Sequence, residues 1–322
     1  MTRYLALALA LFASPALADG QLAIKVGYSP GGSYDMSARL VADFIGKHLP
    51  GTPDVVVEND PGAGSLKLAK SFMASTTTDG TEIATIGSTL ALMPIFEPDS
   101  TDFDPRKVHY LASLANQASF CYALKSSGIA TIEDFLTKDI KVGATGKAST
   151  TYTYPAAIKH ALDARFEIVV GFEGGAEIDL AMERGDIQVR CGTGKDDLTA
   201  DGLIDRVNVL AELSPVPRNE IEGVAYLLDR VTDPKTREAL ALVFGSSTVH
   251  HPYIAPPGTS DEAVATLRAA FAAMAADPEF QAEAVRRGMD PEFTPGEEVE
   301  ARIDALLATA PEIATLARDL VQ

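Results

Sequence analysis

The sequence predicts an α/β protein with two similar halves, each built from repeated strand–turn–helix units. Short apolar runs of period two alternate with segments whose apolar residues recur at helical spacing. Glycine-rich turns separate the two kinds of segment. Strands that alternate with helices in this way indicate βαβ units, in which parallel strands form a sheet and helices cover it.

The clearest unit is the first strand, turn and helix. Residues 22–28 alternate and predict a strand, 29–33 form a turn, and the apolar spacing over 36–45 predicts a helix that Pro50-Gly51 ends. The same order then recurs. We expect strands at 55–57 and 83–86, a helix at 66–73, and a further helix that begins at Gly87-Ser88-Thr89.

The middle of the chain repeats this scheme, and the C-terminal part is mainly helical. Thr131 is a suitable N-cap for a short helix. A capping box at 259–262 begins the first C-terminal helix. We expect strands at 140–142, 166–170 and 207–211, helices at 132–136, 155–162 and 177–183, and C-terminal helices at 278–288 and 297–307.

The composition is that of a globular protein with excess negative charge. Of the 322 residues, 46% are apolar and 22% are charged. The 27 Lys and Arg residues against 45 Asp and Glu residues give a net charge of −18. A nucleic-acid-binding protein, or one that docks to an anionic membrane, needs a basic surface, so the charge excludes both classes.

Residues 1–18 have the features of a cleavable export signal. Arg3 supplies a positive charge, residues 5–13 form an apolar run too short to cross a bilayer of ~30 Å, and Ala16-Leu17-Ala18 is a cleavage site. We expect cleavage after Ala18, a net charge of −19 once Arg3 is lost, and a periplasmic location. The alternative is a buried N-terminal helix.

Cys121 and Cys191 are the two cysteines of the chain. Two cysteines so far apart exclude a zinc knuckle or an iron–sulfur cluster. Export permits a disulfide, which would close a loop of 71 residues and stabilise the fold by roughly 4 kcal/mol. We favour this bond over two separate buried thiols.

Three glycine-rich turns are candidates for binding an anion. Each precedes a predicted helix, whose N-terminus presents unpaired N–H groups and about half a positive charge. The alternative is a purely structural role, since α/β proteins use glycine in such turns. The turns are 29–35, 87–89 and 145–150, with hydroxyl donors on Ser29, Ser33, Ser88, Thr89, Thr145, Ser149 and Thr150.

Asp35 and Arg39 lie four residues apart at the start of the first predicted helix. We expect an i,i+4 ion pair that stabilises this helix start. A contact between Asp35 and a ligand is the alternative.

Two motifs carry a resemblance to a known family. The sequence YSPGGSYD at 28–35, followed by Ala38-Arg39, resembles the opening motif of the substrate-binding proteins of tripartite tricarboxylate transporters, the Bug or TctC family. VENDPGAG at 57–64 resembles the second signature. Weaker similarity continues at 142–146, 171–174 and 255–259. The match covers nearly all of the chain after the export signal.

The resemblance implies a two-lobed periplasmic binding protein fold of type II, in which each lobe is a sheet flanked by helices and the ligand lies between the lobes. We expect lobes at 19–120 plus 225–322 and at 121–224. Cys121 and Cys191 then lie near the lobe boundaries, where a bond would limit hinge motion. The implied protein is a monomer that is not an enzyme, needs no cofactor, captures a small carboxylate and delivers it to membrane transporter subunits.

The resemblance also implies which residues surround the ligand. It places one binding turn at 29–35 and the facing turn at 145–150. Lys147 and Arg190 are candidates for a second carboxylate, with surface charge as the alternative, and both lie where this sequence departs from the family pattern. The full expected set is Tyr28, Ser29, Gly31, Gly32, Ser33, Tyr34, Asp35, Gly87, Ser88, Thr89, Thr145, Lys147, Ser149, Thr150, Gly171, Phe172 and Arg190.

Other classes of protein fit the sequence less well. The motifs of P-loop NTPases, of G-x-S-x-G hydrolases and of H-E-x-x-H metalloproteases are absent from the sequence. Residues 197–208 begin like a calcium loop but end in Asn208 where Glu is expected. A ferric site would use Tyr152 or Tyr154 with His250 or His251. A ligand sensor that feeds a signalling kinase stays open.

Overall fold

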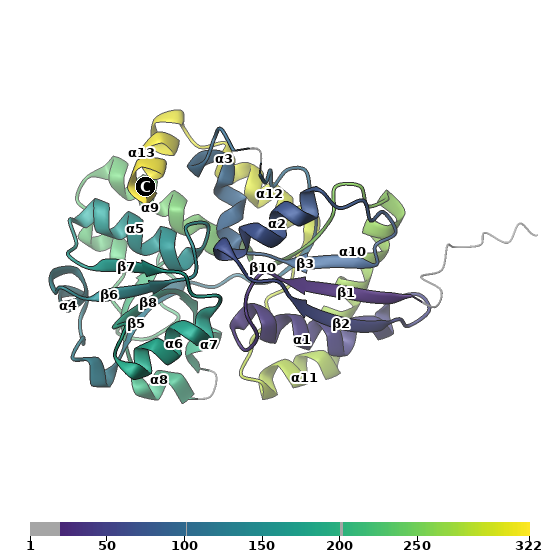
Figure 1. Cartoon of the computed structure of the whole chain (residues 1–322), viewed down its shortest axis with the longest axis horizontal. Coiled ribbons are helices and arrows are strands. Elements are labelled where there is room, and N and C mark those ends of the chain that lie inside the picture. Colours follow the sequence, from purple (N-terminus) through teal and green to yellow (C-terminus); the bar gives the residue numbers. More distant parts are fainter. Residues whose placement is uncertain (1–19, 101, 200–201) are drawn as a thin grey trace, which may run out of the picture.

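The computed structural model describes residues 20–100, 102–199 and 202–322. The expected export signal and its cleavage site lie outside these residues. Two sheets lie side by side, each flanked by helices (Figure 1). This arrangement confirms the predicted α/β class and the two-lobed architecture. None of the described helices combines the length and apolar character that crossing a bilayer requires.

The first sheet has six strands in the order β11-β4-β10-β3-β1-β2. β1 pairs in parallel with β2 and β3, whereas β10 is antiparallel to β3 and β4. The strands are β1 (Gln21–Val26), β2 (Asp54–Asn59), β3 (Glu82–Thr85), β4 (His109–Ala115), β10 (His250–Ala255) and β11 (Thr294–Pro295).

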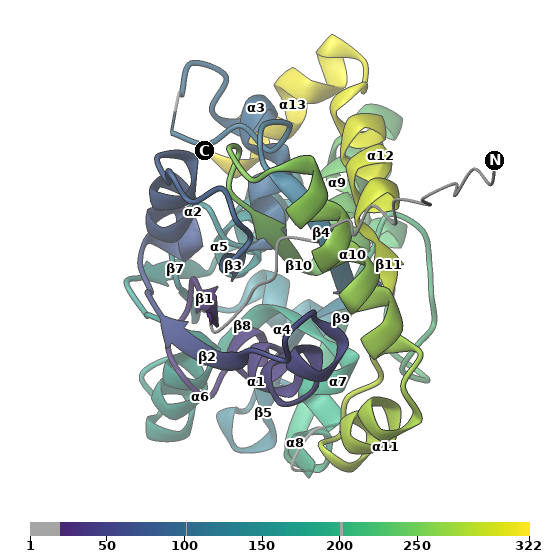
Figure 2. The ribbon, with the colours of Figure 1, turned by 90° about the vertical axis from the view of Figure 1, so that its right-hand side faces the viewer.

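Helices cover both faces of this sheet. One apolar cluster joins it to α1 (Ser33–Ile45), α10 (Asp261–Ala275) and α11 (Pro278–Arg286). A second cluster joins its other face to α2 (Leu66–Met73) and α12 (Gly296–Leu307). In Figure 2, α12, α10 and α11 follow one another from top to bottom on the right-hand side.

The second sheet has five strands in the order β7-β6-β8-β5-β9. β6 is parallel to β7 and β8, and β5 is antiparallel to β8 and β9. The strands are β5 (Ser119–Leu124), β6 (Lys141–Ala144), β7 (Glu167–Val170), β8 (Val189–Gly194) and β9 (Val207–Leu213).

Helices from three parts of the chain cover the second sheet. One face packs on α3 (Met93–Phe96), α4 (Ile132–Thr137), α5 (Thr150–Leu162), α9 (Pro234–Phe244) and α13 (Pro311–Val321). The other face carries α6 (Gly175–Arg184), α7 (Lys195–Thr199) and α8 (Leu203–Arg206). Thr131 caps α4 with a full capping box, as the sequence predicts.

We expected parallel strands in the sheets, and this expectation was wrong. The sheets are mixed, because β10 and β5 run against their neighbours. The sequence also gave no prediction for β4, β5, β8 and β10. These four strands are buried along nearly their whole length, so they lack the alternation by which a half-exposed strand is recognised. The helix expected from Gly87 starts as a 3₁₀ helix over Ser88–Leu92.

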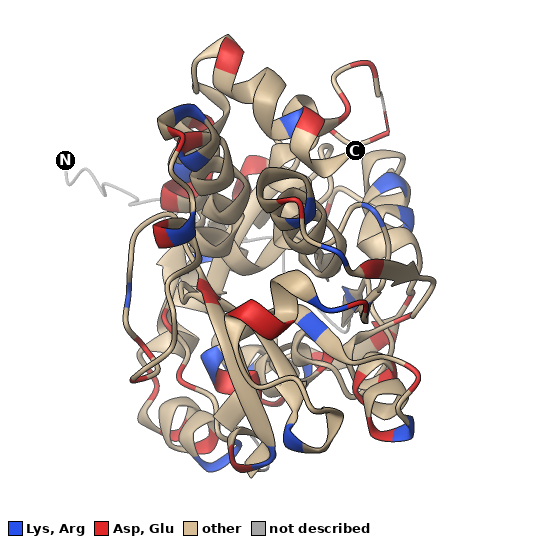
Figure 3. Cartoon of the chain, turned by 90° about the vertical axis from the view of Figure 1, so that its left-hand side faces the viewer, with Lys and Arg blue, Asp and Glu red and all other residues tan. Residues whose placement is uncertain are grey.

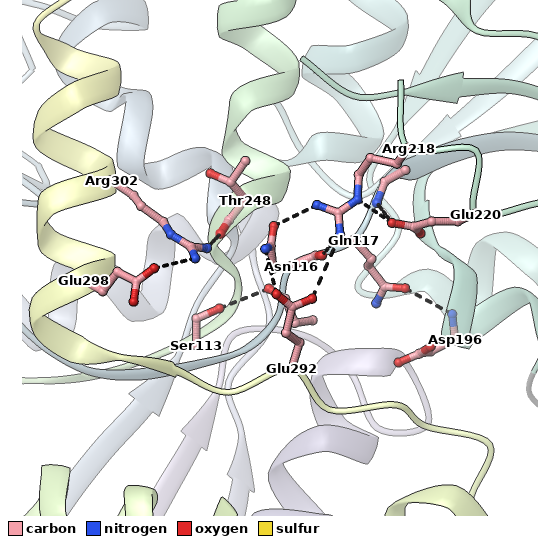
Figure 4. Close-up of polar contacts among 12 residues, drawn as sticks. Ser113, Asn116, Gln117, Asp196, Arg218, Glu220, Thr248, Glu292, Glu298 and Arg302 are labelled. Carbon is pink, nitrogen blue, oxygen red and sulfur yellow. Dashed lines mark hydrogen bonds and ion pairs between the residues drawn. The ribbon is translucent and has the colours of Figure 1, made fainter. Parts of the chain in front are cut away.

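The chain crosses between the sheets at Asn116 and Gln117, and polar contacts bind this crossing to its surroundings (Figure 4). Asn116 Nδ2 donates to Glu292 Oε1 (2.9 Å), and Arg218 Nη1 donates to Asn116 Oδ1 (3.0 Å). Gln117 Oε1 accepts a bond from the backbone N–H of Asp196 (3.2 Å). The crossing therefore contacts segments from both halves of the molecule.

The C-terminal helix α13 packs beside α5 and α9 (Figure 1). α3, α9 and α13 therefore share the core of the second sheet, although they lie outside 121–224. We propose lobe boundaries that assign these three helices to the second lobe in place of the first.

Cys121 and Cys191 form a disulfide, which confirms the predicted pairing. Both residues are fully buried, and they lie in the adjacent strands β5 and β8 of one sheet. The bond ties two strands of the second sheet and does not join the two sheets. The expectation that it limits hinge motion therefore stays a prediction, and this position gives it no support.

Candidate functional site

A small cavity lies where the turn after β1 meets the turn after β7. The backbone N–H of Ser29 donates to the carbonyl oxygen of Glu173 (3.1 Å), which joins the two turns directly. The cavity beside them has a volume of ≈ 180 Å³. Gly31, Gly32 and Ser33 line it from the first half, and Ala176, Asp179, Arg190 and Asp197 line it from the second. The site therefore lies between the two sheets.

The N-terminus of α1 forms one wall. Gly32 is the N-cap residue and supplies no side-chain cap, so the first N–H groups of the helix are available to a ligand. Asp35 fixes this wall in place. Its carboxylate accepts hydrogen bonds of 2.9 Å from the backbone N–H of Gly31, from Arg39 Nε and from Asn59 Nδ2. The predicted Asp35–Arg39 pair is present, and Asp35 holds the turn from behind.

The N-terminus of α6 forms the opposite wall. Its N-cap residue, Gly174, also provides no side-chain cap. The backbone nitrogen of Gly175 lies 3.7 Å from the position that a Cβ on Gly32 would take. The two helix N-termini therefore face each other at close range, and their partial positive charges add.

The Arg190 guanidinium adds a full positive charge to these helix ends. The Arg190 side chain is 9% exposed, and a Cβ on Gly175 would overlap its guanidinium. Nη1 donates to Asp179 Oδ2 (2.7 Å) and to the hydroxyl of Tyr122 (3.3 Å). Nε has no hydrogen-bond partner among the described residues. A cation at a helix N-terminus is unfavourable by itself, and an anion at this position would relieve the repulsion.

Asp197 is one of three acidic residues that line the cavity, together with Asp179 and Glu183. Burial raises the pKa of the Asp197 carboxyl to about 6, although the positive charge of Arg190 acts to lower it. The negative charge of Asp197 also acts on Tyr34 of α1, where it contributes to raising the pKa of the tyrosine. The site thus combines a strong cation, two helix ends and a buried acid.

Buried aromatic and hydroxyl groups extend inward from the α1 wall. The Tyr34 hydroxyl accepts the backbone N–H of Ser88 (3.2 Å), and its ring centroid lies 4.5 Å from that of His251 and 5.5 Å from that of His250. Burial lowers the pKa of His250 to about 4. Burial is also the main cause that lowers the pKa of His251, and the charge of His250 lowers it further. Both histidines are therefore neutral at pH 7.

Several hydroxyls of the expected set are buried without partners. Ser29 Oγ, Ser88 Oγ and Thr89 Oγ1 form no hydrogen bond within the described part of the chain. Buried polar atoms are normally paired, so unpaired ones indicate positions that a ligand or water satisfies. Tyr28 behaves differently, because its hydroxyl donates to the carbonyl oxygen of Gly64 (3.4 Å).

The turn 145–150 holds the two halves against each other. The Thr145 and Ser149 hydroxyls bond to that of Thr151, at 3.1 and 2.7 Å. A Cβ on Gly146 would lie 2.6 Å from the backbone of Ala63 and Gly64, so this glycine permits the close approach. Thr150 contacts Gly192 with its hydroxyl.

Of the seventeen expected residues, only Gly31, Gly32, Ser33 and Arg190 line the Arg190 cavity. Several of the others lie on different surfaces. Lys147 is exposed and lines a different cavity of ≈ 430 Å³, between α2, α3 and the C-terminus. Phe172 lines a surface hollow on the outer side of α6. Gly171 adopts φ +115° and has open space around it. A Cβ on Gly87 would overlap the Tyr28 hydroxyl closely, so Gly87 supports the Tyr28 ring.

Sequence reasoning missed Tyr122, Asp179 and Asp197. Tyr122 lies on β5 and Asp179 on α6, and they meet Arg190 only because both elements pack on β8. Asp197 was considered only as the start of a calcium loop, whereas it lies in helix α7. Within the described ranges, no three His, Cys, Asp or Glu side chains are arranged to hold a metal.

The fold is that of the two-lobed periplasmic binding proteins. BugD, a periplasmic binding protein, matches over 93% of this chain and 97% of its own, with a TM-score of 0.73 and 18% identity. MatC from Rhodopseudomonas palustris with bound malate matches over 94% and 99%, with a TM-score of 0.69 and 18% identity. A second R. palustris protein, solved with adipate, matches over 92% and 97%, with a TM-score of 0.72 and 16% identity.

In sequence, the chain is similar to one curated protein. It is 34% identical over 139 residues to a UPF0065 protein encoded in the gbd 5′ region of Cupriavidus necator. The match spans 40% of each chain. No family model matches.

Proposed function

We propose that this protein is a periplasmic solute receptor of the Bug or TctC family that captures a small carboxylate between its lobes. The observation that carries the proposal is the convergence of the α1 and α6 N-termini and Arg190 on one cavity. A carboxylate there would accept backbone N–H bonds and interact with the guanidinium of Arg190, which lines the cavity.

Capture has to be local because the long-range field of the protein is unfavourable. The net charge of −18 repels an anion at a distance. Acidic and basic residues are interspersed over the face drawn in Figure 3. Within the cavity the low dielectric strengthens the attraction of the helix ends and Arg190 for a carboxylate. This contrast favours binding of a small anion in the site over binding to the surface.

The matching structures support the same class of ligand, because one was solved with bound malate and another with adipate. We further propose export to the periplasm, a monomeric state, and delivery of the ligand to membrane transporter subunits. The protein then acts by binding and release without chemical change, and needs no cofactor. A sensor that presents the same ligand to a signalling kinase would use the same site.

A thermal-shift screen tests this function. The protein is unfolded and refolded to strip any carried-over ligand, then scanned with mono-, di- and tricarboxylates, amino acids, sugars and divalent metals. A ligand at 100 times its Kd stabilises the fold by ~2.7 kcal/mol, which gives a rise in Tm of several degrees. A response only to sugars or metals would contradict the proposal.

Variants of Arg190 locate the site. Arg190→Gln should weaken carboxylate binding roughly 10- to 100-fold, as expected for a lost hydrogen bond to a charged group. That change also leaves Asp179 without its partner, so the double variant Arg190→Gln/Asp179→Asn serves as the stability control. Calorimetry should show weak binding in both variants and a Tm closer to wild type in the double variant. Wild-type affinity in the double variant would exclude this cavity.

A further inference from the structure

The cavity contains a carboxylate that the proposed function does not use. Asp179 is paired with Arg190, and Glu183 is paired with Arg206 (3.3 Å). Within residues 20–100, 102–199 and 202–322, Asp197 forms no ion pair. It lines the same cavity as the two helix ends. The charge of Arg190 reaches Asp197, but the direct ion pair of Arg190 is with Asp179. One acid of the site therefore has no ion-pair partner of its own among the described residues.

A ligand that carries only negative charge fits this arrangement poorly. Its carboxylate at the helix ends would lie in one small cavity with the ionised Asp197, and like charges repel strongly where water is excluded. The volume of ≈ 180 Å³ leaves little room to separate the two groups. A ligand with a cationic group beside its carboxylate would satisfy both ends of the site.

We propose that the ligand is a small zwitterion, whose carboxylate binds at the α1 and α6 N-termini with Arg190 and whose protonated amine binds Asp197. This inference rests on the proposed function and specifies its ligand class. Aliphatic amino acids and related amino carboxylates have this chemistry. Ligand pockets for drug-sized molecules measure ~300–1,000 Å³, so the smaller cavity favours a compact ligand.

The charged groups around Asp197 set the sign of the pH dependence. The charge of Arg190 on β8 favours ionised Asp197. The negative charges of Asp179 on α6 and of Asp196 on the same helix as Asp197 oppose its ionisation. The other polar groups around Asp197 are Tyr34 on α1 and the Glu183–Arg206 pair. A bound ammonium group requires ionised Asp197. The affinity for a zwitterion should therefore rise between pH 5 and pH 7.5. On the acidic side of this range, binding of the zwitterion should release a proton from Asp197. A diacid that accepts a bond from protonated Asp197 would show the opposite slope.

Matched pairs of ligands test the proposal. Calorimetry on stripped protein compares L-aspartate with succinate, L-glutamate with glutarate, and L-alanine with propionate, because each pair differs by one amino group. In at least one pair the amino acid should bind 10-fold or more tightly than its partner. Asp197→Asn should abolish that preference, and Asp197→Glu should retain it. Asp196→Asn is the matched control on the same helix. It should leave the preference unchanged at pH 7.5, where Asp197 is ionised with or without the Asp196 charge.

The outcomes separate this inference from the proposed function. Tight binding of the carboxylates without the amino group would overturn the zwitterion proposal and leave the carboxylate receptor standing. An unchanged preference in folded Asp197→Asn, checked by circular dichroism, would also overturn it. If neither member of any pair binds, and the wider carboxylate screen is silent, the proposed function fails and this inference fails with it.

Discussion

Arg190 shows how one side chain acquires a role from its neighbours. Its guanidinium is buried beneath Gly175, at the end of a helix that repels it, and is held there by Asp179 and Tyr122. The ion pair with Asp179 compensates part of the cost of burial. The remaining positive potential at the helix ends is available to a ligand.

Gly175 tests this geometry without removing any charge. A Cβ at this position would overlap the guanidinium, so Gly175→Ala should displace Arg190 and weaken ligand binding at least 10-fold. Gly258→Ala is the matched control, because its Cβ would meet only Thr78 at an ordinary 3.7 Å. Equal affinity in the two folded variants would mean that the Arg190 position does not matter for binding.

Asp35 gives a prediction about acid stability. Burial acts to raise the pKa of Asp35, but hydrogen bonds from Arg39, Gly31 and Asn59 outweigh it and hold the pKa below its usual value. A carboxyl whose pKa is lowered by folding stabilises the fold above its unfolded pKa and loses this contribution as pH falls through its folded pKa. Urea unfolding of Asp35→Asn and wild type should therefore differ at pH 7 and converge below pH 3.8. A difference that is constant with pH would contradict this role.

At the scale of elements, the disulfide joins two strands that other interactions already hold together. β5 and β8 pair along the sheet, and the sulfur atoms lie in the core that α5 covers. The cavity is on the opposite face, where Tyr122 and α6 lie. The bond therefore contributes to stability and stays remote from the ligand.

Replacing both cysteines by serine tests this separation. The variant should lose about 2–4 kcal/mol of unfolding free energy, as is usual for a native disulfide. Ligand affinity should stay within twofold of wild type, because the bond does not join the lobes. Calorimetric melting and titration of the same sample measure both quantities. Altered affinity with little loss of stability would instead favour a role in lobe motion.

At the scale of the whole molecule, the described arrangement is a closed one. Ser29 bonds to Glu173 across the interface, and Gly146 packs against the backbone of Ala63 and Gly64. These contacts hold the two halves together beside the cavity. Hinge closure around a ligand is a common motion of two-lobed binding proteins.

Gly146→Val should prevent this closure. The added side chain would meet the backbone of 63–64, which cannot move aside as a flexible side chain does. Small-angle scattering should show a larger radius of gyration in the variant with and without ligand, and affinity should fall at least 10-fold. Gly258→Val provides the control on the far side of the first sheet. A compact, fully active Gly146→Val variant would contradict a closure that depends on this contact.

The sequence predicted the parts of the fold that have a local pattern. β1, α1, β2, α2 and β6 lie close to the predicted positions because alternation, helical spacing and glycine turns are short-range signals. The turn 29–35 was recognised as one wall of the site for the same reason. The strands β4, β5, β8 and β10 were missed because burial on both faces removes the alternation. Asp179 and Tyr122 were missed because no spacing along the chain relates them to Arg190.

The sequence by itself determined the α/β class, the glycine turns that leave helix ends uncapped, and the pair of cysteines that bond. The α/β class and the glycine turns depend on residues that are close in sequence. The disulfide could be predicted because the chain has only two cysteines. Only the tertiary structure decided that the α1 and α6 N-termini face each other, and that Arg190 belongs to the cavity and Lys147 does not. It also decided that Arg190 pairs directly with Asp179, whereas Asp197 forms no ion pair within the described residues. These features arise because segments that are distant in the sequence pack together. The same packing decides which charged groups are buried, and the buried groups set the charge balance of the site.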